Sequence, residues 1–371
     1  MSATIDRSGW KRVRLGEVLT YEQPYPYIVH KAEYVSNGTP VLTPGKTFIL
    51  GYTTETDGIC RASSDAPRIL FDDFLTISRL VQFDFKVKSS AVKILLPVST
   101  SHNLRFIFYA MSRLQFEVTD HQRHWINQFS KLEIQVPTRQ EQDRIADAID
   151  SIDTHISALQ SLIAKYEAIK KATVNLLLKP TGTHMVKLGE VADISRGGSP
   201  RPIQDYITAD IDGINWIKIG DVSVDAKYIK QTEERIKPTG VAMSRQVKAG
   251  DFILSNSMSF GRPYILKIDG CIHDGWLAIQ NYQNTFDVDY LYYLLGSDMV
   301  FAQYIENAAG SSVKNLNKDI VAKITLPSPP LSEQCKIAEQ ITAIDNVLAD
   351  YKAQLEKARQ LKAGMMSYFF G

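Results

Sequence analysis

The sequence has few cysteines, no long apolar run and almost no net charge. Its three cysteines, Cys60, Cys271 and Cys335, lie far apart without Cys-x-x-Cys spacing, which argues against a disulfide framework or a zinc site and favours buried, reduced thiols. No stretch approaches the roughly 18 apolar residues that a membrane-spanning helix needs, and residues 1–10 are polar, so we expect a cytoplasmic protein without a membrane partner. A net charge of +1 excludes gripping nucleic acid by bulk electrostatic attraction alone.

Motifs of the common enzyme classes are also missing. The sequence contains no Walker loop, no dinucleotide-binding glycine fingerprint, no His-Glu-x-x-His, no Gly-x-Ser-x-Gly, and no Asn-Pro-Pro-aromatic motif of the kind that amino-methyltransferases use. His273 and Asp274 could join a serine in a triad, but a lone His-Asp pair is far more often structural, because a triad needs three roles to converge. We therefore expect no catalytic residue, no metal and no bound cofactor; a nuclease is the weakest alternative.

What the sequence does contain is an internal repeat. Residues 137–142 and the apolar positions after them return as 329–334 and theirs, so that Ile145-Ala146 becomes Ile337-Ala338, 192 positions later. A second echo, Leu-Gly-Glu-Val at 15–18, returns at 188–191, an offset of 173. Because a missed repeat misassigns a whole fold, this pattern outranks other signals. It predicts two half-repeats, each a globular segment followed by a long helix, with an insertion or a different decoration in the second globular segment.

Each helical segment carries a heptad pattern. Apolar positions recur in steps of four and three over residues 145–166 and 337–369, with one lapse at Lys362, where we expect the adjacent Leu361 to cover the seam. A mean step of 3.5 residues is typical of a coiled coil. Two matched stripes predict that the helices pack together in antiparallel orientation, with the globular domains at opposite ends of a rod. The alternative, in which each helix packs only on its own domain, is weaker because the two registers match.

The globular segments are predicted to be mixed α/β domains. In the first, short apolar and β-branched runs indicate strands at 40–43, 47–50, 69–71, 75–77 and 92–96, and a helix at 104–116. In the second, strands are expected near 216–219 and 251–254, and a helix over 288–304. The predicted fold class is α+β, with two such domains related by pseudo-two-fold symmetry and separated by an antiparallel coiled coil. We expect the first domain at 1–136, the first helix at 137–180, the second domain at 181–327 and the second helix at 328–371.

Polar loops with basic residues punctuate both domains. They lie at 85–90 and 121–124 in the first domain and at 195–202, 255–263 and 311–315 in the second. Arg, Lys, Asn and Ser side chains are the donors that reach base edges and phosphates, and glycine allows the backbone to approach closely. By composition alone, each loop taken singly is better explained as an ordinary solvated turn.

Taken together, these residues resemble the specificity subunit of type I restriction-modification systems. The resemblance is carried by the two Leu-Gly-Glu-Val starts, the two Pro-x-x-x-Glu-Gln-x-x-Ile-Ala helix openings, and Leu-Lys-x-Gly-Met-Met at 361–366. The second half is also similar to one class of target-recognition domain through residues 197–202, 216–221 and 271–276. The first half is similar to another class through residues 71–74 and 85–90. The match covers essentially the whole chain.

The resemblance implies a non-catalytic reader of double-stranded DNA, in which each domain reads half of a bipartite target and the helices set the unread gap. Two modification subunits, which carry S-adenosylmethionine, would dock on the helices and domains, and two restriction subunits can join. The candidate DNA-binding residues are Lys46, Lys86, Lys88, Ser89, Ser90, Arg123, Arg196, Ser199, Arg201, Lys218, Ser257, Ser259, Arg262, Lys314 and Asn315. The candidate partner-binding residues are Glu141, Gln142, Glu333 and Gln334. The alternative function is a coiled-coil scaffold that binds proteins without reading DNA.

Overall fold

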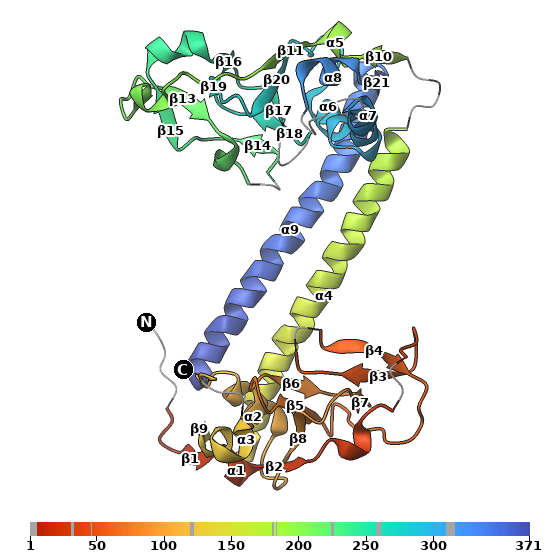
Figure 1. Ribbon diagram of the computed structural model, residues 1–371, viewed down its shortest axis with the longest axis vertical. Helices are drawn as coiled ribbons and strands as arrows, with labels where there is room; N and C mark the ends of the chain where they lie inside the picture. The colour runs from red at the N-terminus through yellow and green to blue at the C-terminus, as the bar shows by residue number, and fades with distance from the viewer. Residues whose placement is uncertain are drawn as a thin grey trace. The chain divides into compact units, whose positions relative to one another are not determined.

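The computed structural model describes residues 6–30, 33–45, 47–118, 122–179, 182, 184–223, 226–256, 261–308 and 316–371. The chain divides into two compact units, one of residues 1–161 with 352–371 and one of residues 162–351. Each unit contains one sheet-rich domain and parts of two long helices, α4 (Arg139–Leu177) and α9 (Leu331–Phe370), drawn yellow-green and blue in Figure 1. At 1.5 Å per residue each helix is about 60 Å long. The predicted pair of α/β domains with two long helices is confirmed.

The first domain is built on a four-stranded antiparallel sheet, in the order β2-β8-β5-β6, and a three-stranded sheet, in the order β4-β3-β7. Helix α2 packs its apolar face on the larger sheet, where Phe106 and Ile107 join Phe71 in the core. Its strands are β1 (Lys11–Arg14), β2 (Leu19–Glu22), β3 (Thr39–Leu42), β4 (Ile49–Thr53), β5 (Arg68–Asp72), β6 (Ser78–Val81), β7 (Lys86–Val87), β8 (Val92–Pro97) and β9 (Glu133–Val136). Its helical segments are α1 (Leu15–Val18), η1 (Tyr25–Tyr27), α2 (Leu104–Met111), α3 (His124–Asn127) and η2 (Phe129–Lys131).

One predicted strand of this domain is wrong. Residues 75–77 belong to the connection between β5 and β6, which begins with a turn at 73–75, because the Asp72 carboxylate accepts hydrogen bonds from the backbone N–H groups of Phe74 and Leu75. Thr76 then takes a φ of 56°, which no β-strand contains, and β6 begins only at Ser78. A short polar side chain at the end of β5 therefore overrides the β-propensity of the residues that follow.

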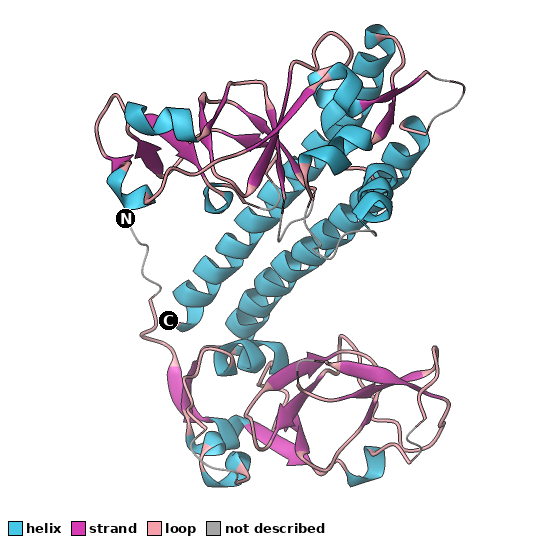
Figure 2. Ribbon diagram, turned by 45° about the horizontal axis from the view of Figure 1, so that its top comes forward, coloured by secondary structure: helices cyan, strands magenta, loops and turns pink. Residues whose placement is uncertain are grey.

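The second domain has two five-stranded sheets, in the orders β11-β20-β17-β18-β14 and β12-β15-β13-β19-β16, drawn magenta in Figure 2. This larger set of strands agrees with the different decoration expected of the second half. Its strands are β10 (Met185–Lys187), β11 (Asp193–Arg196), β12 (Ile207–Thr208), β13 (Ile214–Ile217), β14 (Tyr228–Ile229), β15 (Glu234–Ile236), β16 (Arg245–Val247), β17 (Phe252–Ser255), β18 (Pro263–Leu266), β19 (Gly270–Ile272), β20 (Trp276–Gln280) and β21 (Thr325–Pro327). Its helical segments are α5 (Leu188–Val191), η3 (Ile203–Asp205), η4 (Ile219–Asp221), η5 (Pro238–Met243), α6 (Val288–Leu295), α7 (Asp298–Ala308) and α8 (Lys318–Lys323).

The helical run expected over 288–304 is two helices. Gly296 ends α6, and the Ser297 hydroxyl donates to the carbonyl of Leu294 while accepting from the backbone N–H of Val300. Ser297 thus satisfies backbone groups at the end of one helix and at the start of the next. The apolar periodicity runs through this break, which is why it was not visible in the sequence.

The repeated Leu-Gly-Glu-Val motif is a single helical turn that is pinned to the strand before each long helix. The backbone N–H of Leu15 donates to the carbonyl of Leu132, and that of Leu188 donates to the carbonyl of Ile324, both at 2.9 Å. Strand β1 pairs antiparallel with β9, and β10 pairs in the same way with β21. The start of each domain is therefore held beside the start of the helix that follows it, which explains why these two distant motifs repeat together.

Within each unit, α4 and α9 run side by side (Figures 1 and 2). In the unit of residues 162–351, the rings of Tyr166 and Tyr351 lie 5.5 Å apart between centroids, and Lys170 Nζ lies 2.6 Å from Asp345 Oδ1. The number rises along α4 while it falls along α9, so the helices are antiparallel. Long-range packing of the heptad stripes is confirmed, and the alternative in which each helix packs only on its own domain is wrong.

Lys362, the expected lapse in the heptad pattern, is a seam residue. In the unit that contains the chain's end, its Nζ lies 2.6 Å from Asp153 Oδ1, whereas Leu361 is 55% exposed and covers nothing. Asp153 and Lys362 stand 192 positions from Asp345 and Lys170, respectively, so the two ion pairs are one repeated contact with the helices exchanged. A charged residue on the stripe therefore keeps the register and does not interrupt it.

The ends of the long helices complete the domain cores. Met366 near the end of α9 is buried in the core of the first domain, with Met365, Phe369 and Phe370 packed against it. In the second domain, Leu178 just after α4 is buried in the core, and Val174 and Leu177 pack against it. Each domain thus buries the far end of the other domain's helix.

The three cysteines do not share one environment. Cys60 and Cys271 are buried, as expected, and burial raises the pKa of Cys60 to about 12. Cys335 on α9 is exposed, in an open hollow that Asp287 and Asp289 also line, so the expectation of a buried thiol is wrong there. Across the described part of the chain, no helix combines the length and the apolar character that spanning a bilayer requires.

Candidate nucleic-acid interface

Two segments of the second domain, at the ends of β11 and β17, converge on Asp274, which lies in the loop between β19 and β20. The backbone carbonyl of Asp274 accepts hydrogen bonds from Arg196 Nε at 3.2 Å and from Asn256 Nδ2 at 2.9 Å. Its backbone N–H donates to Ser199 Oγ at 3.4 Å, and its carboxylate lies 3.2 Å from Arg201 Nη2. Three of the predicted DNA-binding residues, from one loop, therefore meet around an acidic residue that was not predicted.

His273 stands beside this cluster and is already engaged at both ring nitrogens. Its Nε2 lies 3.0 Å from Asp274 Oδ1, and its Nδ1 accepts the backbone N–H of Gly275 at 3.0 Å. The ring also meets Trp216 edge-on, with 5.9 Å between centroids. These contacts support the structural interpretation of the His-Asp pair, since a general base needs a free nitrogen for its nucleophile.

Close backbone approach explains the glycine in this loop. A Cβ built on Gly197 would lie 2.1 Å from the carbonyl oxygen of His273, so any larger residue would push the two loops apart. The Gly197 N–H also donates to the Trp276 carbonyl. The sequence suggested that glycine in this loop lets the backbone approach DNA, but Gly197 is required to let this loop approach the loop that contains His273.

Two further predicted DNA-binding residues of this domain, Lys218 and Arg262, are not among the residues that contact Asp274. Lys218 follows β13 and pairs with Glu234 at 2.9 Å, and the hydrogen bond to that carboxylate raises the pKa of Lys218. Arg262 is half-buried just before β18. Lys218 is therefore a partly neutralised cation that would have to exchange one anion for another on binding a phosphate.

In the first domain, the loop after β7 brings together four predicted residues. Lys88 and Ser89 are exposed, and Lys88 Nζ lies 5.8 Å from the ring centre of Tyr34. Arg123 Nη2 donates to the carbonyl of Ser90 at 3.5 Å, which joins the segment before α3 to this loop. The four residues form a basic surface with exposed donors, and the buried Asp73 lies beneath it, with Oδ2 4.0 Å from Arg123 Nη1.

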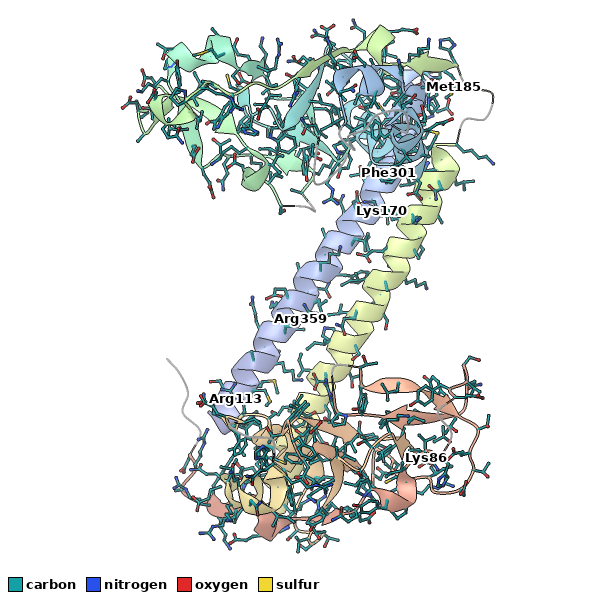
Figure 3. All side chains as sticks on the ribbon, in the orientation of Figure 1. Lys86, Arg113, Lys170, Met185, Phe301 and Arg359 are labelled. Atoms are coloured by element: carbon teal, nitrogen blue, oxygen red, sulfur yellow. The ribbon has the colours of Figure 1, made fainter. Side chains whose placement is uncertain are left out.

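Lys86 is not part of this surface, which corrects one prediction. Its side chain is fully buried, with Nζ 2.8 Å from Glu55 Oε2 and donating to the Asp57 carbonyl at 2.9 Å. Figure 3 draws it among the strands of the first domain. Both residues of β7 are buried and the strand ends at Val87, so Lys88 lies beyond it in the loop, where it is exposed to solvent. The ammonium of Lys86 cannot reach a phosphate without unfolding its surroundings.

Five further predicted DNA-binding residues lie outside the described residues, namely Lys46, Ser257, Ser259, Lys314 and Asn315.

The two repeated glutamines are structural locks and are not available to a partner, which corrects a second prediction. Gln142 is 1% exposed; its side-chain oxygen accepts the Asn103 N–H at 2.8 Å, and its amide donates to the Pro137 carbonyl at 3.0 Å. Gln334 is 0% exposed and repeats both contacts, with the Asp287 N–H at 2.9 Å and the Pro329 carbonyl at 2.8 Å.

Asn103 and Asp287 are the N-caps of α2 and α6, so each glutamine ties a domain helix to the first turn of a long helix. The neighbouring Glu141 and Glu333 are half-buried and exposed, respectively, and stay candidates for partner contact. The repetition of these glutamines in the sequence indicated that they matter, but it does not show whether they bind a partner at the surface or stabilise the fold from inside.

Asp274 and Asn256 are the functional candidates that composition missed. An aspartate is a poor phosphate ligand and was not counted among DNA-binding residues, although its position next to His273 was visible. Within the part of the chain that is described, no three His, Cys, Asp or Glu side chains gather as metal ligands.

Two sheet-rich domains, each locked by the same repeated residues to one of two antiparallel helices, define the class of DNA-specificity proteins with two recognition domains. The chain belongs to the family described as the type I restriction modification DNA specificity domain, whose model matches residues 7–169 and 180–358. Both halves match the same family, as the internal repeat requires. The predicted function, sequence-specific DNA recognition in a type I restriction-modification system, is confirmed over the scaffold alternative.

Relatives of known class span most of the chain. The specificity subunit of the type I restriction enzyme EcoR124I/EcoR124II from Escherichia coli is 29% identical over 371 residues, which cover 96% of this chain and 91% of that protein. The type I restriction enzyme MjaVIII specificity subunit from Methanocaldococcus jannaschii is 25% identical over 199 residues, 52% of this chain and 42% of that one.

Solved structures share the fold. The S subunit of a type I restriction-modification system from M. genitalium aligns with a TM-score of 0.69 at 16% identity, covering 100% of this chain and 98% of that one. A chain from a structure describing complex assembly and conformational transition of the type I R-M system aligns with a TM-score of 0.57 at 18% identity, covering 98% of each chain.

Proposed function

We propose that this chain is the non-catalytic specificity subunit of a DNA methyltransferase and endonuclease complex, and that each of its domains reads one half of a bipartite target. The observation that carries this proposal is the convergence of Arg196, Ser199 and Arg201 on one loop of the second domain. Lys88 and Arg123 supply a comparable surface in the first. The unlike domains imply unlike half-sites, and the paired helices imply a fixed, unread gap.

The near-neutral charge is consistent with this role only if partners share the phosphate contacts. In the proposal, the methyltransferase subunits carry S-adenosylmethionine and extrude the target base, which requires a dedicated pocket and costs a few kcal/mol. The role proposed for this chain is recognition of the sequence and positioning of those subunits.

Exposed apolar residues support docking of two methyltransferase subunits. Ile169 and Leu176 on α4 are 39% and 73% exposed, and their counterparts 192 positions later, Leu361 and Tyr368 on α9, are 55% and 39% exposed. Each pair is spaced by seven residues, so it lies on one face of its helix. Two equivalent apolar faces are expected to bind two copies of the same methyltransferase subunit. In the proposal, two restriction subunits can then join the assembly.

The test of the two-reader model is a domain exchange followed by methylome sequencing of a host that expresses the chain with its methyltransferase. Replacing residues 14–136 by the first domain of another specificity subunit, while keeping α9, should change one half of the methylated sequence and leave the other half and the gap as they were. The reciprocal exchange of residues 188–327 should change only the second half. Unaltered specificity in both chimaeras would defeat the model.

The docking faces can be tested separately with Leu176→Glu and Tyr368→Glu. Each change places a charge in one apolar face, so native mass spectrometry should find one methyltransferase subunit per complex in place of two, and none in the double variant. Lys165→Glu, at an exposed position of α4, is the control. Two bound subunits in all variants would show that these faces are not the docking sites.

A further inference from the structure

The guanidinium of Arg201 is both exposed and oriented. Its side chain is 79% exposed, and the hydrogen bond from Nη2 to Asp274 Oδ2, at 3.2 Å, is its one described contact with the protein. An arginine carries five N–H donors in a planar fork. Among the described residues, the other donors of Arg201 have no protein partner, so one edge of the fork is fixed while donors are left for a ligand.

Asp274 is itself held by its neighbours, so it can fix Arg201. Its carbonyl accepts from Arg196 and Asn256, its N–H donates to Ser199, and its second carboxylate oxygen lies 3.0 Å from His273 Nε2. Three of these four contacts use the backbone, which any residue at position 274 would retain. Changing the Asp274 side chain should therefore alter the orientation of Arg201 without opening the loop.

The carboxylate decides what kind of ligand suits this arginine. A phosphate is an anion, and Asp274 would repel it at the same time as Arg201 attracts it. The major-groove edge of guanine presents two neutral acceptors, O6 and N7, which match the fork of an arginine and which a nearby carboxylate does not repel to that extent. Phosphate binding also gains little from a fixed orientation, whereas bidentate contact with a base requires one.

We infer that Arg201 reads a guanine in the half-site of the second domain, and that Asp274 is the positioning residue that holds it for this contact. The inference rests on the proposed function, because it names one base contact of a domain that is proposed to read DNA. Arg196 and Ser199, which brace the same loop, then support the reading residue and do not themselves need to touch a base.

The experiment uses the full chain in complex with its methyltransferase. Methylome sequencing of the wild type first defines the bipartite target. The complex is then bound to duplexes in which each base pair of the second half-site is changed in turn, for the wild type, Arg201→Lys, Arg201→Gln, Asp274→Ala and Asp274→Asn. Arg113→Lys, at an exposed arginine of the first domain that is labelled in Figure 3, is the matched control.

Arg201→Lys is the decisive variant, because lysine keeps the charge but loses the fork. The wild type should prefer G·C at one position by about 5- to 150-fold, which corresponds to roughly 1 to 3 kcal/mol for a bidentate base contact. Arg201→Lys should lose most of that preference at that position alone, and the control should keep it. Asp274→Ala should lose part of it and bind unrelated duplexes more tightly, and Asp274→Asn, whose amide oxygen still accepts from Arg201, should retain more than Asp274→Ala.

Three results would overturn the inference. The first is a second half-site without any G·C pair, and the second is a variant Arg201→Lys that discriminates between base pairs as well as the wild type. The third is that Arg201→Gln binds all duplexes more weakly by the same factor and that the slope of its affinity against salt falls by about one, since this is the signature of a lost phosphate contact. Failure of the proposed function is a different outcome, because the wild-type complex would then show no bipartite methylated sequence at all.

Discussion

The sharpest structural prediction concerns Gln142, whose replacement by leucine should loosen the first domain from its helix. Leucine has a similar volume but no polar atoms, so the change removes the bonds to the Asn103 N–H, the Pro137 carbonyl and the Ser101 carbonyl, at 2.8, 3.0 and 3.3 Å. Each lost bond costs about 1 kcal/mol net, and the buried partners left unsatisfied add more. The expected loss is therefore about 3 to 5 kcal/mol.

Two measurements check this estimate. Urea unfolding gives the total loss. Hydrogen exchange of the Asn103 backbone N–H gives the local effect, because Asn103 is the N-cap residue of α2 and its N–H donates to Gln142 in the native state. A loss of 3 kcal/mol should accelerate that exchange by about 100-fold if it proceeds by local opening. The exchange measurement does not depend on two-state unfolding, which a chain with two units need not show.

The matched control is Gln140→Leu, two residues away at an exposed position of the same first turn. It should change stability by less than about 0.5 kcal/mol. If Gln142→Leu behaves like Gln140→Leu in both measurements, the hydrogen bonds of Gln142 do not stabilise the first domain, and Gln142 is again a candidate for partner binding. Gln334→Leu should repeat the effect in the second domain, where the amide of Asp287 reports on it.

Two more predictions follow from buried and half-buried charges. Reversing either charge of the seam pair, with Asp153→Lys or Lys362→Asp, should destabilise the pairing of α4 with α9. In a double-mutant cycle the double reversal should show a coupling energy of about 1 kcal/mol, since both groups are about one-third exposed. A coupling energy of zero would show that this ion pair does not help to set the helix register. Lys86→Met should lower the stability of the first domain by about 3 to 5 kcal/mol, as measured by thermal unfolding, because the buried Glu55 carboxylate loses its cation, and it should leave the methylated sequence of the surviving complex as it was. A new base preference with undiminished stability would restore Lys86 to the DNA-binding surface.

The linear pattern of residues determined the repeat, the two long helices and their antiparallel pairing. The apolar stripe is a local pattern that can be read directly from the sequence, and so is its copy 192 residues later. Two such stripes in one chain can be buried against each other by pairing the helices. Strands β13 and β17 were likewise visible as short apolar runs. The turn at residues 73–75 and the break at Ser297 were not, because one polar side chain in each case satisfies backbone groups and overrides the local propensity.

Which polar residues face inward was decided by the tertiary structure. Gln142, Lys86 and Lys362 read as surface residues in the sequence, yet one is a buried lock, one a buried ion pair and one a seam contact. Their partners lie 39, 31 and 209 positions away in Asn103, Glu55 and Asp153, distances over which no local pattern operates.

The site follows the same division. Residue types alone pointed to Arg196, Ser199 and Arg201, because the hydrogen-bonding groups that nucleic acids accept are a property of each side chain. Their convergence on Asp274 required the fold, since that residue lies more than 70 positions away and reaches the loop only through the pairing of β11 with β20. Sequence fixes which chemistry each side chain carries, whereas the neighbours that orient, bury or neutralise it are set by strand register and helix packing.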